Sequence, residues 1–151
     1  MMANILLVDD DLENLWALQL ALEANGHRVM VVEDAGRALD LLRREPVHFM
    51  ITDYEMPIVD GAQLCRMVRA WGAHSSLPIV MLSAAPEPVS APRAWTYFLR
   101  KPAGFGTLSG LIDAHVAPRL TGVKRVSVEA SLRCAQRAAS RWPAIIAYCW
   151  P

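Results

Sequence analysis

The stretch VHFMITDYEMPIVDG at residues 47–61 decides how the rest of this chain folds. Its first six residues form an uncharged, mostly apolar run, which is typical of a strand buried on both faces of a sheet. The MP and DG pairs that follow are turn-forming and end the extended segment. Asp53 is therefore predicted to lie at the carboxyl end of a central strand. Because open parallel α/β sheets bind ligands at that edge, position alone makes Asp53 a candidate site residue.

Strand-like and helix-like segments alternate around this stretch. The alternation predicts one doubly wound α/β domain with a parallel five-stranded sheet, right-handed crossovers and the strand order 2-1-3-4-5. Apolar runs predict strands at 4–8, 29–33, 47–52, 78–82 and 96–100, and helical periodicity predicts helices at 12–24, 35–44, 62–70 and 108–116.

Polar side chains follow four of the five predicted strands, at the point where each strand ends. The carboxyl ends of parallel strands share one edge of the sheet, so we expect these groups to lie close together. They are Asp9 and Asp10 after the first strand, Asp53 after the third, Ser83 after the fourth and Lys101 after the fifth.

The order and spacing of these residues resemble the receiver domain of two-component response regulators, over residues 3 to 117. The resemblance implies a flavodoxin-like fold and a stand-alone switch that is phosphorylated, not a classical enzyme. It consists of Asp9-Asp10, of Asp53 with the following Met56-Pro57 and Asp60-Gly61, of Ser83-Ala84 and of Lys101-Pro102.

The resemblance implies that Asp53 is the phosphoacceptor and that the cofactor is Mg²⁺. Asp10 and Asp53 would bind the ion directly, Asp9 through water, and Glu55 through its backbone carbonyl. Physical chemistry supports this, because clustered carboxylates repel one another without a cation and Mg²⁺ prefers oxygen ligands. Lys101 would add positive charge at the phosphoryl oxygens.

The resemblance also implies a switch pair, Ser83 and Phe98. Two alternatives remain open at this stage: Ser83 can simply end a strand by bonding nearby backbone, and Tyr97 can replace Phe98 as the switch aromatic. The Glu55 side chain can either orient hydrolytic water or repel it, and the sequence does not decide between these effects.

The segment between the fourth and fifth strands departs from the family pattern. Pro86, Pro88 and Pro92 interrupt it, and an interior proline costs a helix about 3 kcal/mol while pushing the preceding residue toward extended geometry. The fourth helix is therefore expected to be degraded or absent. Residues 84–95 are still about long enough for a parallel crossover.

Charge divides the chain into two predicted parts, a receiver domain at 1–117 and a basic tail at 118–151. The first part carries 9 basic and 14 acidic side chains and the second carries 6 and 1, which gives −5 and +5. The tail is too short for a winged-helix domain, so we expect no direct DNA binding. Its apolar spacing at 128–142 predicts a basic amphipathic helix. Three alternatives remain open for the tail: it docks on its own domain, it binds a partner or a second copy, or it is incidental sequence without a function.

The remaining composition argues for a cytoplasmic protein with no membrane segment. Three cysteines lack a CxxC or Cys/His cluster, and the N-terminus has neither a basic region nor a long apolar run. We expect phosphoryl transfer from a histidine kinase or histidine phosphotransfer protein, an unidentified downstream protein, and possible homodimerisation. The alternatives are a receiver-like scaffold that never cycles and a haloacid-dehalogenase-type phosphatase with Asp9 as nucleophile, although the latter lacks a late acidic pair.

Overall fold

The fold was obtained as a computed structural model, which describes residues 2–89 and 92–116. Five parallel strands form one sheet in the order β2-β1-β3-β4-β5, which confirms the predicted fold class. The strands are β1 (Asn4–Val8), β2 (Arg28–Val32), β3 (Phe49–Asp53), β4 (Ile79–Ser83) and β5 (Tyr97–Arg100). The helices are α1 (Leu12–Ala24), α2 (Ala35–Arg44), α3 (Gly61–Ala70) and α4 (Phe105–Val116), with a short 3₁₀ turn η1 (Gly72–His74).

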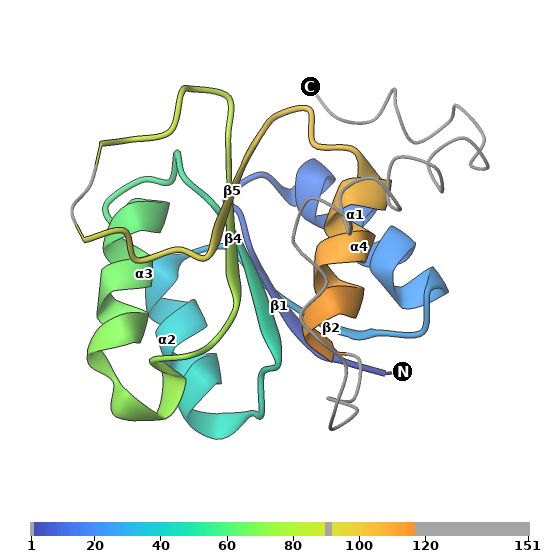
Figure 1. Cartoon of the computed structure of the whole chain (residues 1–151), viewed down its shortest axis with the longest axis horizontal. Helices are drawn as coiled ribbons and strands as arrows, with labels where there is room; N and C mark the ends of the chain where they lie inside the picture. Colours follow the sequence, from blue (N-terminus) through green and yellow to red (C-terminus); the bar gives the residue numbers. More distant parts are fainter. Residues whose placement is uncertain (1, 90–91, 117–151) are drawn as a thin grey trace.

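The helices form one layer on each face of the sheet. Helices α2 and α3 cover one face, and α1 and α4 cover the other (Figure 1). Alternate residues of each central strand enter one of two apolar clusters, so that Met50 packs under α2 and α3 while Ile51 packs under α1 and α4. All residues of β3 and β4 are buried, which explains why their sequences lack the polar alternation of a half-exposed strand.

Side-chain caps fix the loops that leave the carboxyl edge of the sheet. Asp11 accepts a hydrogen bond from the Glu13 amide (2.9 Å) at the start of α1. Asp60 and Gln63 form a capping box at the start of α3, with the Gln63 amide donating to Asp60 Oδ1 at 2.7 Å. Such caps are each worth about 1 kcal/mol. Hydrogen bonds between residues close in sequence therefore fix two of the loops that surround the predicted site.

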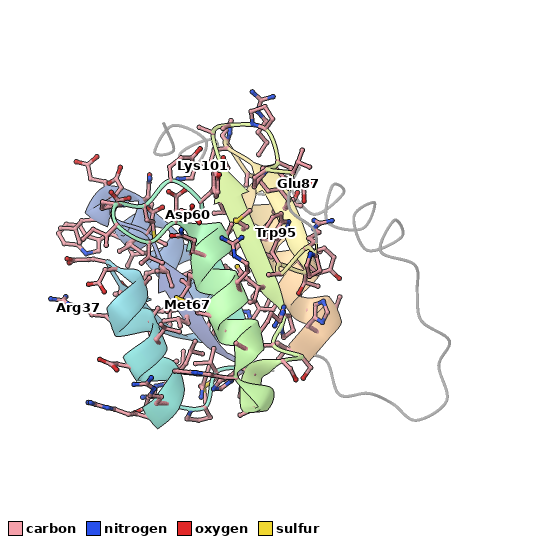
Figure 2. The ribbon with its side chains drawn as sticks, turned by 90° about the vertical axis from the view of Figure 1, so that its left-hand side faces the viewer. Arg37, Asp60, Met67, Glu87, Trp95 and Lys101 are labelled. Atoms are coloured by element: carbon pink, nitrogen blue, oxygen red, sulfur yellow. The ribbon has the colours of Figure 1, made fainter. Side chains whose placement is uncertain are left out.

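The crossover from β4 to β5 contains no helix in its described parts, residues 84–89 and 92–96, as the prolines predicted. Side chains hold it in place. Arg69 of α3 donates to the Ala94 carbonyl (2.9 Å), and the Trp95 indole donates to Glu87 Oε1 (2.7 Å). Trp95 is 4% exposed and packs in the apolar cluster below α2 and α3 (Figure 2). In its described parts, the crossover thus has a non-helical segment in place of the helix of the family pattern, and it packs on the sheet through Ala94 and Trp95.

Ile58, in the loop between β3 and α3, is predicted to be a strained residue whose replacement stabilises the domain. It has a φ of 70° and is fully exposed, so a β-branched side chain sits in the left-handed region with no burial to offset the cost. We expect Ile58→Asn to raise the free energy of unfolding by about 1 kcal/mol, measured by urea denaturation. Val89→Asn removes an equally exposed apolar side chain and should stay within about 0.5 kcal/mol of wild type. Equal gains in the two variants would show that backbone strain is not the cause.

None of the helices in the described part of the chain has the length and apolarity needed to cross a membrane. The amphipathic helix expected at 128–142 lies outside the described residues, as does the rest of the tail at 118–151.

Candidate functional site

The carboxyl edge of the sheet brings together side chains from four strand ends. Asp53 is the last residue of β3 and Ser83 the last of β4, while Asp9 and Lys101 directly follow β1 and β5. The pairing of Asp53 with Leu82 and of Ser83 with Arg100 places the ends of β3, β4 and β5 next to one another. Figure 2 shows Lys101 at the same end of the molecule as Asp60, the cap of α3.

Three carboxylates form a compact cluster at this edge. Asp9, Asp10 and Asp53 each offer an oxygen within 4.8 Å of the others. Asp9 and Asp53 are buried, whereas Asp10 is exposed. Burial raises the pKa of Asp53 to about 6, and the neighbouring Asp9 and Glu55 carboxylates add to the shift while Lys101 opposes it. Burial likewise raises the pKa of Asp9, against the Asp11 amide and Lys101. The cluster therefore holds unfavourable negative charge.

Lys101 is the cation that compensates part of this charge. Its Nζ lies 2.8 Å from Asp53 Oδ1 and 3.4 Å from Asp9 Oδ2, and its side chain is only 11% exposed. Burial lowers the pKa of Lys101, but the two carboxylates raise it more strongly, so the pKa is raised and the ammonium is retained. Three carboxylates and one ammonium leave two net negative charges in the ionised site. Their oxygens are the ligand type that a hard divalent cation such as Mg²⁺ takes.

Glu55 turns its side chain toward the end of β4. Its Oε1 accepts a hydrogen bond from Ser83 Oγ at 2.6 Å and from the Ala85 amide at 3.2 Å. Partial burial opposes the shift, but the Ser83 hydroxyl and the amides of Ala85 and Ala84 hold the pKa of Glu55 below its usual range. Ser83 Oγ also accepts from the Ala85 amide at 2.9 Å, so the expected backbone bond of Ser83 exists as well.

The two candidate switch aromatics lie on opposite faces of β5. Phe98 pairs with Met81 and packs against the cluster under α2 and α3, on the face to which Ser83 belongs by alternation along β4. Tyr97 packs on the other face, where its hydroxyl forms a 2.9 Å hydrogen bond with His115 Nε2. The placement favours Phe98 over Tyr97 as the partner of Ser83, and the switching role itself stays a prediction.

Gly61 allows a close backbone approach that the sequence, in which it was interpreted only as a turn residue, did not reveal. It begins α3, and its amide donates to the Tyr54 carbonyl at 3.0 Å. A Cβ atom at this position would overlap the carbonyl oxygen of Asp53. Only a glycine lets the helix start so close to the strand that carries Asp53. The DG pair is thus explained by a close backbone approach.

Comparison with known proteins identifies the class to which this fold and site belong. The model of the response regulator receiver domain family matches residues 5–112, and the chain therefore belongs to that family. The sensor protein GacS of Pseudomonas syringae pv. syringae is 40% identical over 84 residues, which cover 54% of this chain. A response regulator receiver protein from Pseudomonas putida is 28% identical, with a TM-score of 0.65 over 75% of this chain and 97% of that one.

The response regulator TrrA of Thermotoga maritima, solved in complex with Mg²⁺ and BeF, shares the fold. It is 24% identical, with a TM-score of 0.67 over 74% of this chain and 97% of that one. The curated relatives are longer proteins. The chain spans 9% of the length of GacS and 36% of that of the response regulator MprA of Mycolicibacterium vanbaalenii. The similarity therefore concerns the receiver domain and not the whole of these proteins.

Proposed function

We propose that the chain is a phosphorylation-dependent signalling switch in which Asp53 accepts a phosphoryl group. The observation that carries the proposal is the 2.8 Å contact between Lys101 Nζ and the Asp53 carboxylate, within a cluster of three carboxylates at the carboxyl edge of the sheet. A structural ion pair would need one carboxylate, not three. The excess of negative charge fits a site that is completed by a divalent cation.

Asp9, Asp10, Asp53 and the Glu55 carbonyl would hold Mg²⁺, and Lys101 would bind the phosphoryl oxygens. The bound ion supplies charge neutralisation that lets an anionic phosphoryl donor approach the carboxylates. An Asp53 carboxylate oxygen attacks phosphorus while the bond from phosphorus to the donor's leaving group breaks, which gives an acyl phosphate. Lys101 is held in place for this step by its contacts with Asp53 and Asp9. The protein contributes position and charge, and the chemistry is that of a switch and not of a classical enzyme.

The donor in this proposal is a histidine kinase or a histidine phosphotransfer protein, and the phosphorylated state is passed on by protein contacts. Residues 1–117 form the receiver domain, and the basic segment at 118–151 has no role in reading DNA. The family membership supports the phosphoryl donor, and the charge division of the sequence supports the boundary between the two parts.

The direct test is the intact mass of the full chain after incubation with acetyl phosphate. We expect one phosphoryl group in the presence of Mg²⁺ and none with EDTA, with the modification mapped to Asp53. An acyl phosphate on Asp9 would support the phosphatase alternative. If the chain forms no adduct under conditions that phosphorylate a known receiver domain, the result would support the alternative of a receiver-like scaffold that does not cycle between phosphorylated and unphosphorylated states.

A further inference from the structure

Glu55 contacts two polar groups at the end of β4, the strand that pairs with the Asp53-bearing β3. The residue is exposed in its loop after β3, yet its carboxylate reaches the fully buried Ser83 side chain. One oxygen, Oε1, accepts both the Ser83 hydroxyl (2.6 Å) and the Ala85 amide (3.2 Å). Two donors on one carboxylate oxygen form a specific contact, because charge-assisted hydrogen bonds are the stronger kind.

A serine hydroxyl carries one proton and therefore donates to one acceptor at a time. In the proposed switch, Ser83 donates to an oxygen of the phosphoryl group on Asp53. In the present structure the same proton is given to Glu55. The two acceptors are both anionic and both border the end of β4, so one excludes the other from Ser83.

We infer that the Glu55 carboxylate is a built-in competitor of the phosphoryl group for Ser83, and so a positioning residue that sets how strongly the phosphorylated state is held. The inference rests on the proposed function. Formation of the phosphorylated state requires Ser83 to leave Glu55, and repulsion between the carboxylate and the phosphoryl group adds to that cost. Glu55 thus lowers the affinity of the site for a phosphoryl group without touching Asp53 itself.

The inference is tested with beryllofluoride and Mg²⁺ on the full chain, followed by ¹⁹F NMR of the bound fluoride. We expect Glu55→Ala, which removes the contact, to bind beryllofluoride about fivefold more tightly than wild type, and Glu55→Gln, which keeps an acceptor but loses the charge, to lie in between. Asp34→Asn removes a carboxylate from another loop at the same sheet edge and retains an acceptor at the α2 cap, so it is the matched control. Its affinity should change by less than about twofold.

A double-variant cycle distinguishes competition for Ser83 from simple repulsion. In a Ser83→Ala background the Glu55 carboxylate has lost the hydroxyl, and the gain from Glu55→Ala should fall below about twofold. An equal gain with and without Ser83, or no gain in either Glu55 variant, overturns the inference while leaving the proposed function standing. Absence of Mg²⁺-dependent beryllofluoride binding in wild type overturns the proposed function, and the inference with it. Urea unfolding of each variant confirms that the compared proteins are folded.

Discussion

Replacing Asp53 by asparagine should abolish phosphoryl uptake and, in the absence of a divalent cation, make the domain more stable. The amide retains the size of the side chain but is not the nucleophile that an acyl phosphate requires. It also removes one carboxylate from a cluster of three. Asp53 is the most buried of them, with 4% of its surface exposed. Loss of the 2.8 Å ion pair with Lys101 opposes this gain, although Lys101 keeps Asp9 at 3.4 Å. We expect a net stabilisation of about 1–2 kcal/mol at pH 7.5.

The pH dependence gives the sign of this effect. The pKa of Asp53 is raised from 3.8 to about 6 by burial, with Lys101 opposing and the nearby carboxylates adding. A carboxyl group whose pKa is higher in the folded state contributes stability that is fully present below pH 3.8 and is lost as the pH rises through 6. Wild type should therefore lose about 1–3 kcal/mol relative to Asp53→Asn between pH 4 and 7.

Urea unfolding of both proteins with EDTA, across this pH range, measures the difference. Added Mg²⁺ should stabilise wild type and leave Asp53→Asn nearly unchanged, because the variant has lost one of the proposed metal ligands. Asp40→Asn serves as the control, since Asp40 is an exposed carboxylate paired with Arg43 on α2 and should show neither effect. A pH-independent difference between wild type and Asp53→Asn would contradict the raised pKa.

The fold could be predicted from the sequence because the central strands are buried on both faces and therefore appear as uninterrupted apolar runs. The apolar runs predicted β1 with correct bounds and the other strands to within one or two residues. The remaining shifts arise because pairing sets the strand ends. For example, Thr96 was expected inside the last strand, but its hydroxyl oxygen accepts from the Ile79 amide at 3.0 Å before the paired residues of β5 begin. Composition alone does not show such a contact.

The sequence predicted that the segment between β4 and β5 is not helical, but it did not predict the side-chain contacts that stabilise this segment. Prolines exclude a helix by local geometry, which a sequence shows directly. The contacts that hold the segment join residues distant in sequence, such as Arg69 with Ala94 and Thr96. The same distinction applies to the site: the strand ends predicted the convergence of Asp53 with Lys101, whereas the direction of the Glu55 side chain depended on tertiary contact with β4.

Gly61→Ala adds a single methyl group and is expected to lower the free energy of unfolding strongly. An ideal Cβ at Gly61 would overlap the Asp53 carbonyl oxygen and lie 3.0 Å from both the Asp53 carbonyl carbon and Tyr54 Cα. These are backbone atoms, which cannot rotate away as a flexible side chain can. The start of α3 or the end of β3 must move. We expect a loss of about 3 kcal/mol in the free energy of unfolding.

Gly72→Ala provides a matched control for this prediction. Gly72 lies in the 3₁₀ turn after α3, and an ideal Cβ there meets no atom within 4 Å. Its replacement should leave the free energy of unfolding within about 0.5 kcal/mol of wild type or raise it slightly, because alanine restricts the unfolded chain. A comparable loss in both variants would show that the close approach at Gly61 is not responsible.

The Gly61 substitution should also weaken metal binding by more than its effect on stability explains. The Gly61 amide holds the Tyr54 carbonyl at 3.0 Å, and the proposed ligand from Glu55 is the next carbonyl along the chain. Movement of this loop therefore displaces the backbone ligand and the Asp53 carboxylate together, whereas a purely global destabilisation leaves the folded molecules with normal affinity. Titration of Mg²⁺ at a temperature where the variant is still folded separates these cases. Unchanged affinity in the folded variant would mean that the methyl group is accommodated by α3 alone.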